Sequence, residues 1–479
     1  MRGAHLTRLT RGSCLLLAVL LAGCSAIEGR GTPVPATAPR ITGIERQSER
    51  EHARLVAAFG GEYRAPQTQR LLSEIAGRLV PATERPDEAY QITILNSPVV
   101  NAFALPTGRL YVTRGLLALA NDTSEIAAVL SHEIAHVTLR HALARSELEL
   151  RSALVSRVVA DVLKDPVAGA LVRDQSRVTI ASFSRAQELE ADQAGVKTLA
   201  KAGFDPYGAA RFLHSLSRAG SSPEKSRSSP DMLSTHPSTT ERIALTLQSA
   251  RRIGAPGLGE GDRARYLAAI DGMAYGDDPA DGVVRGRRFV HARLGVAFEA
   301  PEGFSLENTA QAVLGSTNDG SRRLLFDAVE SPDGQSLEEV LRGTWSDSIE
   351  TGSIEATNVN GLPAAIATSR GAEWTFRLAA IRIGATTYRL IFASRSPGAD
   401  LERYFRQTLA SVRQVPSDEA RTVQPLRIQV VQATPGETVE SLAARMAVPD
   451  RQVERFLALN GLDRADALRP GERYKIIVE

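Results

Sequence analysis

The sequence predicts a multidomain protein that is mainly α-helical at first and then carries an α+β module and a small βααβ domain. Three observations support this prediction. Apolar residues recur with the helical period in several segments between about residues 122 and 203. Residues 256–285 are rich in Gly, Pro and Asp, which is typical of a linker, part of which (263–270) can fold back as a helix. Beyond them, strand-like runs predict an α+β module at 286–416, with a hairpin at 289–301, strands at 323–329, 363–369, 373–383 and 387–394, and helices near 337–350 and 399–412. Residues 425–479 follow a strand–helix–helix–strand order.

The amino terminus is predicted to be a secretion signal at residues 1–23. A basic region precedes an apolar run that is shorter than the roughly 20 residues a membrane-spanning helix needs. The string L-A-G-C then ends at Cys24 and resembles a bacterial lipobox, which implies cleavage after Gly23 and a lipid on Cys24. Residues 24–45 would then be a flexible tether. The alternative is an ordinary signal peptide in which the cysteine is incidental.

Cysteine content, net charge and the residue after Cys24 limit the disulfides, metal ligands, partners and location that we expect for this chain. Cys14 lies inside the predicted signal, so the mature chain would have no disulfide and no cysteine that could bind a metal. The net charge of +2 gives no argument for a nucleic-acid partner. Ser25 follows Cys24, and by resemblance to enterobacterial sorting this implies the periplasmic side of the outer membrane of a Gram-negative bacterium.

The most informative feature is an H-E-x-x-H motif formed by His132, Glu133 and His136. Histidines four residues apart lie on one face of a helix and can reach the same metal ion. Glu133 can then act as a general base toward water. Asp122 is the predicted N-cap of this helix, and Glu125 can complete a capping box. The alternative is a buried helix that carries two histidines by chance.

A second predicted helix begins near Ser184 and stops near Gly203, and it offers two rival third ligands, Glu188 and Glu190. Around a helix Asp192 lies roughly 40° from Glu188, whereas Glu190 lies about 200° from it. Only Glu188 therefore shares its face with a second carboxylate, and such a carboxylate can orient a ligand histidine through its free ring N–H. The alternative is that these acids are solvated surface charge.

Together these segments resemble the zinc metallopeptidases of the HtpX/BepA kind, which are gluzincins related to the CAAX-processing proteases. The matching strings are H-E-I-A-H, S-R-A-Q-E-L-E-A-D at 184–192 and N-A-F-A-L-P-T-G-R-L-Y-V-T-R-G-L-L at 101–117. The resemblance covers about residues 46–250. It implies a mainly α-helical gluzincin metallopeptidase domain with a small edge sheet at 46–255.

The resemblance also implies roles for single residues. One Zn²⁺ ion per chain would be the cofactor, and Asp192 would support a ligand from behind. An exposed strand edge beside the cleft would hold an extended peptide by main-chain hydrogen bonds. The implied zinc ligands are His132, His136 and Glu188, the implied base is Glu133, and the implied substrate-binding residues are Asn101, Ala102 and Phe103.

The segment S-T-H-P-S-T-T-E-R at 234–242 resembles the family's T-H-P…E-R segment. In soluble relatives this His can approach the zinc, so His236 is a candidate catalytic or blocking residue and Arg242 a second catalytic candidate. A neutral imidazole can take an open metal position, and a cation can stabilise an oxyanion. The alternative is a structural His236 with Arg242 in a salt bridge.

The two C-terminal regions each resemble a known kind of domain, and one of these resemblances implies a ligand. The opening of 286–416 loosely resembles PsbP-like domains, and its role is unknown. Residues 425–479 resemble a LysM domain through their G-E-T, L-N-G-L and L-R-P-G strings. LysM modules bind glycans that contain N-acetylglucosamine, so peptidoglycan is an expected partner. The alternative is a LysM-shaped domain that contacts protein.

These features predict a lipid-anchored periplasmic zinc metalloendopeptidase whose substrates are unfolded or misassembled cell-envelope proteins. Two alternatives stay open. One is a peptidase that acts on peptidoglycan cross-links, which the LysM resemblance favours. The other is a chaperone or assembly factor that seldom cleaves, which would follow if His236 blocks the zinc.

Overall fold

The structure is a computed structural model that describes residues 43–141, 183–220, 232–309 and 312–479, the last with breaks at 330, 333, 346–348, 351, 372, 397, 449–450 and 464–466. Residues 1–52 and 53–479 form separate units. Cys24, the predicted signal and the predicted tether up to residue 42 lie outside the described residues. Within the parts that are described, no helix combines the length and the apolar character needed to cross a membrane.

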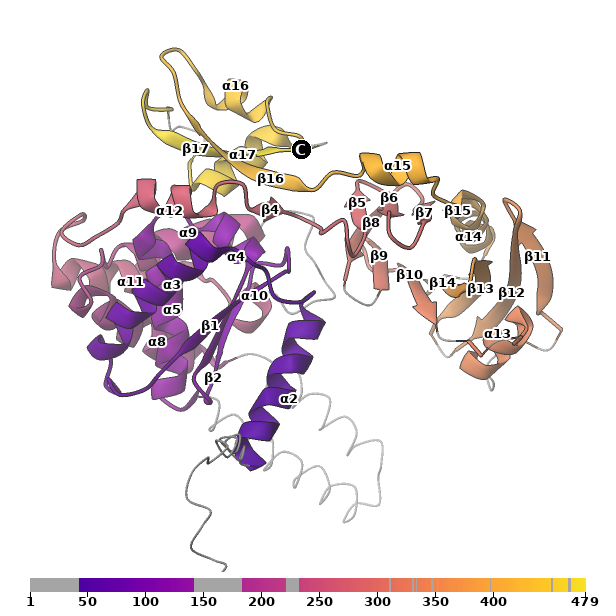
Figure 1. Ribbon diagram of the computed structural model, residues 1–479, viewed down its shortest axis with the longest axis horizontal. Coiled ribbons are helices and arrows are strands. Elements are labelled where there is room, and N and C mark those ends of the chain that lie inside the picture. The colour runs from indigo at the N-terminus through magenta and orange to yellow at the C-terminus, as the bar shows by residue number, and fades with distance from the viewer. Residues whose placement is uncertain are drawn as a thin grey trace, which may run out of the picture. The chain divides into compact units, whose positions relative to one another are not determined.

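The described residues between 43 and 273 are mainly helical, with one three-stranded sheet. Strand β1 (Gln91–Leu95) pairs in parallel with β3 (Arg109–Thr113), and β2 (Ala102–Leu105) pairs antiparallel with the other side of β3. The elements are labelled in Figure 1. The helices are α2 (Gly43–Ala58), α3 (Pro66–Leu79), η1 (Val80–Ala82), α4 (Arg114–Leu119), α5 (Thr123–Thr138), α8 (Arg185–Lys201), α9 (Gly208–Gly220), α10 (Met232–Thr235), α11 (Thr240–Ile253) and α12 (Arg263–Ile270).

The start of helix α5 confirms one predicted cap and modifies the other. The side chain of Asp122 accepts hydrogen bonds from the backbone N–H groups of Ser124 and Glu125, both at 2.9 Å. The Glu125 carboxylate accepts from the N–H of Asn121 rather than from that of Asp122. The predicted capping box is therefore displaced by one residue. Both side chains still satisfy N–H groups at the start of the helix that carries the H-E-x-x-H motif.

Helix α8 crosses α5 closely, and a glycine makes that crossing possible. Ser184 and Gln187 form a capping box at its start. A Cβ atom on Gly195 would lie 3.3 Å from the backbone nitrogen of His132. A larger side chain there would push the helices apart. The helix ends as predicted near Gly203, whose φ of +83° is readily adopted by glycine.

The predicted linker at 256–285 is not a free connection. Its α12 carries Tyr266, Leu267 and Ile270, all fully buried in the same hydrophobic core as α5. The hydroxyl of Tyr266 donates to the carbonyl of Leu117 at 2.7 Å. Glycine and proline mark the turns on either side of this helix, whose bounds agree with the helix predicted at 263–270.

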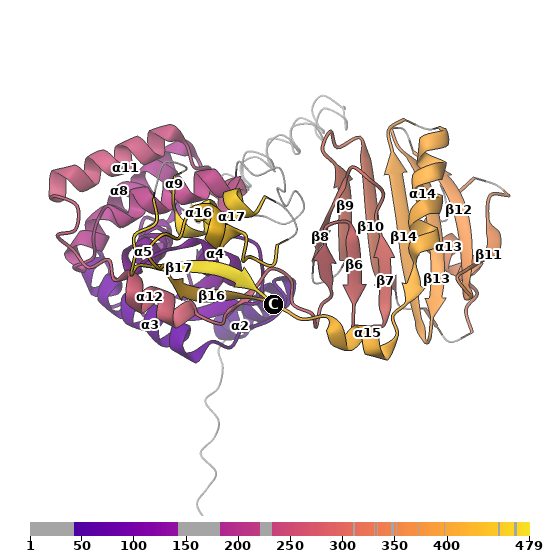
Figure 2. The ribbon, with the colours of Figure 1, turned by 90° about the horizontal axis from the view of Figure 1, so that it is seen from above.

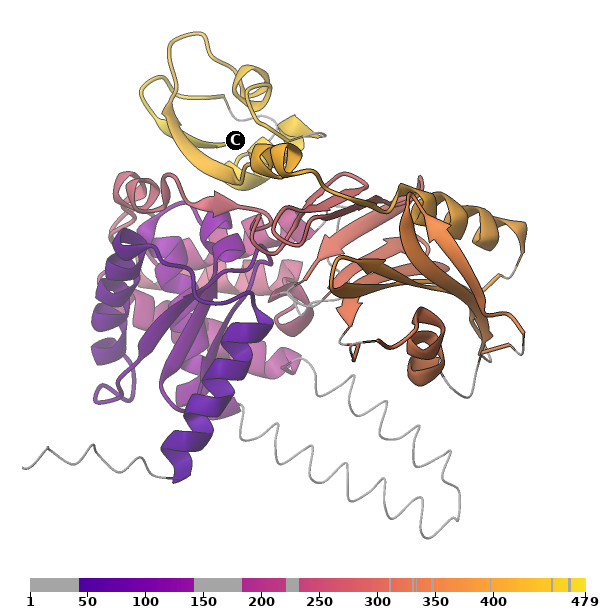
Figure 3. The same ribbon diagram turned by 45° about the vertical axis from the view of Figure 1, so that its right-hand side comes forward.

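The α+β module is built around a seven-stranded antiparallel sheet of order β11-β12-β13-β14-β10-β9-β8 (Figure 2). Helices α13 (Leu337–Trp345) and α14 (Ala399–Ser411) cover opposite faces, as Figure 3 shows. Neighbouring residues of β12 confirm this, because Ile366 packs in the cluster of α14 and Ala365 in that of α13. The strands are β8 (Phe304–Asn308), β9 (Ala312–Thr317), β10 (Arg322–Val329), β11 (Glu355–Val359), β12 (Leu362–Arg370), β13 (Thr375–Ile383) and β14 (Thr386–Ser394).

Four of these strands and both helices lie where the sequence pattern predicts them, whereas β8, β9 and β11 were not predicted. A smaller sheet has the order β15-β7-β6-β5. Its strands β5, β6 and β7 come before the large sheet in the chain, and β15 comes after it. The smaller sheet contains the predicted hairpin. Its strands are β5 (Val283–Arg285), β6 (Arg288–His291), β7 (Val296–Glu299) and β15 (Arg413–Gln414), and the short helix α15 (Ser417–Thr422) comes next.

The C-terminal region has the predicted βααβ order and is attached to the helical region by a buried lysine. Lys475 is completely buried and donates to the carbonyl oxygens of Ala118 and Ala120, at 2.6 and 2.7 Å. These carbonyls lie at the end of α4. Strand β16 of the C-terminal region also pairs with the short strand β4 (Ala274–Tyr275). The region comprises β16 (Leu426–Gln432), α16 (Val439–Ala443), α17 (Gln452–Asn460) and β17 (Arg473–Val478).

Candidate active site

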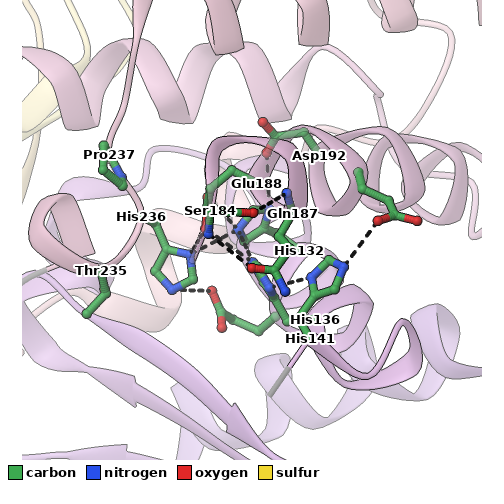
Figure 4. A network of polar contacts seen from close by, with 12 residues as sticks. His132, His136, His141, Ser184, Gln187, Glu188, Asp192, Thr235, His236 and Pro237 are labelled. Carbon is green, nitrogen blue, oxygen red and sulfur yellow. Dashed lines mark hydrogen bonds and ion pairs between the residues drawn. The ribbon is translucent and has the colours of Figure 1, made fainter. Parts of the chain in front are cut away.

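Helices α5 and α8 bring the three predicted metal ligands together. The Nε2 atoms of His132 and His136 lie 3.0 Å apart. The Glu188 carboxylate lies 3.5 Å from the first and 3.6 Å from the second. All three side chains are buried. Figure 4 shows them converging between the two helices.

These distances fit a metal ion. In a tetrahedral zinc site with ligands about 2.0–2.1 Å from the ion, the ligand atoms lie about 3.3 Å from one another. Two imidazole Nε2 atoms at 3.0 Å would repel each other if both presented lone pairs, and a shared cation removes that repulsion. Together with His236, the set His132, His136 and Glu188 places four ligand atoms within 4.8 Å of one another. The residues therefore fit a divalent metal.

Asp192 and Arg242 contact the candidate metal ligands His132 and Glu188 and can hold them in position. The Oδ1 atom of Asp192 lies 3.0 Å from Nδ1 of His132, so it can hold that ring with Nε2 facing the site. The guanidinium of Arg242 donates to both oxygens of Asp192, at 2.7 and 2.8 Å, and forms an ion pair with Glu188 at 2.7 Å. It also donates to the carbonyl of Pro237. Arg242 was predicted either as a catalytic residue or as part of a salt bridge, and it forms ion pairs with both carboxylates.

Glu133 and His236 face each other across the same site. Glu133 is 2% exposed, and its Oε1 atom makes no hydrogen bond within the described residues. The Nε2 atom of His236 lies 3.9 Å from this oxygen. The Nδ1 atom of His236 lies 2.9 Å from Glu188 and 3.3 Å from Nε2 of His132. One nitrogen of the His236 ring thus faces the candidate base and the other faces the candidate ligands; Figure 4 shows the ring beside Glu188.

The charged groups of the site shift one another's pKa values. Burial raises the pKa of Glu133, although nearby histidines counteract this. Burial lowers the pKa of His136, and the neighbouring histidines lower it further. Burial disfavours protonation of His132, but Asp192 and Glu188 outweigh it and raise the pKa of that imidazole to about 10. The two carboxylates therefore attract positive charge to His132, and a metal cation at Nε2 meets the same need as a proton.

The predicted substrate-binding strand lies beside α5. β2 pairs only with β3 among the described residues, so its other edge is the edge of the sheet. Ala102 is buried, and the Phe103 ring stacks on Tyr111 at 4.8 Å between ring centroids. The carbonyl of Val100, next to Asn101, accepts from the N–H of Met232 at 2.9 Å. The loop that carries His236 is therefore hydrogen-bonded to the start of this strand.

Two further residues near the motif were not predicted to take part. His141 lies 2.9 Å from His136 between their Nδ1 atoms. The Phe183 ring stacks on that of His136, with centroids 3.9 Å apart. A His five residues after the motif and a Phe just before the Ser184 cap were the available signals. Neither follows helical spacing, so no periodic pattern indicates them.

Comparison with known proteins agrees with this geometry. Residues 66–249 match the model of "Peptidase family M48". The chain is 34% identical over 163 residues to Mitochondrial metalloendopeptidase OMA1 of Arabidopsis thaliana, covering 34% of this chain and 32% of the relative. It is 29% identical over 191 residues to the Beta-barrel assembly-enhancing protease of Escherichia coli (strain K12), covering 37% and 38%. A putative enzyme of the same name from Vibrio cholerae is 32% identical over 201 residues, covering 39% and 40%.

The aligned segments span less than half of each of these relatives. The family match, which runs from residue 66 to residue 249, includes the H-E-x-x-H helix and Glu188. Residues 66–249 therefore match peptidase family M48, in agreement with the resemblance to the HtpX/BepA kind of metallopeptidase.

Proposed function

We propose that this protein is a zinc metalloendopeptidase that cleaves unfolded or misassembled proteins of the bacterial cell envelope. One observation carries the proposal: two imidazole nitrogens and a carboxylate converge at tetrahedral spacing, with a buried carboxylate base beside them. Glu188 and not Glu190 belongs to this group. The names of the relatives, a metalloendopeptidase and a β-barrel assembly-enhancing protease, support the choice of polypeptide substrates.

The chain's own residues account for the proton transfers. A bound zinc ion would supply Lewis acidity toward a scissile carbonyl and toward water. Glu133 takes the proton from the attacking water at Oε1 and delivers it to the leaving amine. Its burial favours this role, because a raised pKa makes the carboxylate a stronger base. The free edge of β2 holds the substrate chain in extended form.

Cleavage of an unfolded polypeptide tests this proposal. Purified protein incubated with reduced, unfolded casein should release peptides, a zinc chelator should stop the release, and added Zn²⁺ should restore it. Muropeptides offered in parallel should stay intact. Cleavage of muropeptides instead would favour the peptidoglycan alternative, and binding of casein without cleavage would favour the chaperone alternative.

His236 is proposed to inhibit the resting enzyme. Its ring lies 2.9 Å from Glu188 and 3.9 Å from Glu133, so it occupies the space that an attacking water needs. We expect His236→Ala to raise the rate of casein cleavage severalfold while zinc content stays unchanged. His214→Ala, an exposed histidine on α9, is the matched control and should have no effect. A fall in rate would instead assign His236 to transition-state stabilisation, and an unchanged rate would leave it a structural residue.

The lipid anchor is proposed from the L-A-G-C string that ends at Cys24. It would hold the enzyme at the periplasmic face of the outer membrane, and residues 425–479 would add a contact to peptidoglycan. Mass spectrometry of the mature amino terminus should find an acylated Cys24 as the first residue. An unmodified terminus at another residue would rule the anchor out.

A further inference from the structure

His141 lies directly after the end of the ligand helix. Helix α5 ends at Thr138, and Arg140 has a φ of +59°, which is a left-handed conformation that a continuing helix does not allow. The His141 ring lies edge-on to that of His136, with centroids 4.9 Å apart. His141 is 4% exposed, although it lies just beyond the helix end. A polar ring this deeply buried needs hydrogen-bond partners.

Both nitrogens of His141 have such partners. Its Nδ1 lies 2.9 Å from Nδ1 of His136, which Figure 4 shows beside it. Its Nε2 lies 3.4 Å from Oε2 of Glu190. Glu190 is the rival that was not expected to bind metal, and it lies on a different side of α8 from Glu188. The two glutamates therefore approach the H-E-x-x-H motif at different points, Glu188 from the metal side and Glu190 through His141.

Metal binding fixes the direction of these hydrogen bonds. If His136 presents the lone pair of Nε2 to a metal, its proton is on Nδ1. Nδ1 of His136 then donates to Nδ1 of His141, which must be an acceptor, and the proton of His141 is on Nε2. That N–H points to the Glu190 carboxylate, which can only accept. Each group in the chain His136–His141–Glu190 thus has a single consistent role.

The same arrangement exists on the other ligand. Nδ1 of His132 faces Asp192, which in turn accepts from Arg242. Both ligand histidines are therefore held through Nδ1, one directly by a carboxylate and the other by a carboxylate acting through a second imidazole. Such partners fix the tautomer and the orientation of a ligand ring and raise its basicity.

We propose that His141, backed by Glu190, is the positioning residue of the metal ligand His136. The proposal rests on the metal site of the proposed function and adds to it. The stack of Phe183 on His136 restrains the plane of the ligand ring, and His141 restrains its rotation and its tautomer.

Zinc affinity tests this proposal in the full-length protein. Competition with a chromophoric chelator measures the dissociation constant of Zn²⁺ for each variant. His141→Phe keeps a ring but no acceptor, and we expect it to weaken zinc binding about 10–100-fold. His141→Asn offers an amide oxygen to Nδ1 of His136 and should recover part of the affinity. Glu190→Gln should weaken binding in the same direction but by less.

Controls separate this role from general damage. His214→Phe makes the same substitution at an exposed histidine, and Glu241→Gln removes a charge at a partly exposed carboxylate, so both should bind zinc like the wild type. If His141→Phe does not fold, Glu190→Gln decides, because that side chain is 62% exposed. Wild-type affinity in these variants, while the wild-type protein binds zinc and cleaves casein, would overturn the role of His141 and leave the proposed function standing. Absence of zinc binding by the wild type itself would overturn both.

Discussion

Replacing Glu133 by glutamine is expected to lower the rate of peptide cleavage about 100- to 10,000-fold, the usual range for removing a general base. Glutamine has nearly the same size but cannot take a proton from water. The side chain is 2% exposed and lies opposite the ligand set, so the loss should be chemical rather than structural. Peptide release from casein at saturating zinc measures the effect.

Two controls define this result. Glu133→Gln should bind zinc and unfold like the wild type, because the neutral amide leaves the ligands His132, His136 and Glu188 in place. Glu241→Gln changes a glutamate at the protein surface and should cleave normally. If Glu133→Gln cleaves casein at the wild-type rate, the peptidase activity does not arise at this site.

Replacing Arg242 by methionine is expected to lower the free energy of unfolding by about 3–5 kcal/mol, the usual cost of removing one partner from a buried ion pair. Arg242 is 3% exposed and neutralises two buried carboxylates, Asp192 and Glu188. Methionine fills the space but leaves these carboxylates without their cation. Arg242→Lys should recover only part of the loss, because one ammonium group cannot form the paired bonds that a guanidinium makes. Urea denaturation followed by circular dichroism measures the change.

A matched control for this substitution is Arg185, whose ion-pair partner Glu241 directly precedes Arg242 in the sequence. Glu241 pairs with Arg185, whose side chain is 74% exposed. Arg185→Met removes the same kind of cation from the same pair of helices, but at the surface, where solvent screens the pair, so it should change the free energy of unfolding little. Equal and small effects of Arg185→Met and Arg242→Met would show that Arg242 does not hold the site together.

The helices and the choice of third ligand could be predicted because they depend on local spacing. The apolar period and the caps at Asp122 and Ser184 define α5 and α8 within the sequence itself. The angle between side chains on one helix was enough to prefer Glu188 over Glu190, and the structure places Glu188 beside both histidines. No tertiary information entered that argument.

Other parts of the site depend on contacts that spacing does not encode. His141 reaches His136 only because Arg140 adopts a left-handed conformation, and nothing in the local pattern requires it. The place of His236 depends on a hydrogen bond from Met232 to Val100, which is far away in the sequence. The same holds for Lys475, whose partners at the end of α4 lie more than 350 residues earlier.

The central claim is that His132, His136 and Glu188 bind one catalytic metal ion. Elemental analysis of the purified and dialysed protein tests it most directly, using the wild type, His136→Ala, Glu188→Ala and the surface control Glu241→Ala. The wild type and Glu241→Ala should each retain about one zinc ion per chain, and the two ligand variants only a small fraction, because two remaining ligands do not hold the ion. A wild type that binds no zinc, or ligand variants that retain all of it, would contradict the assignment.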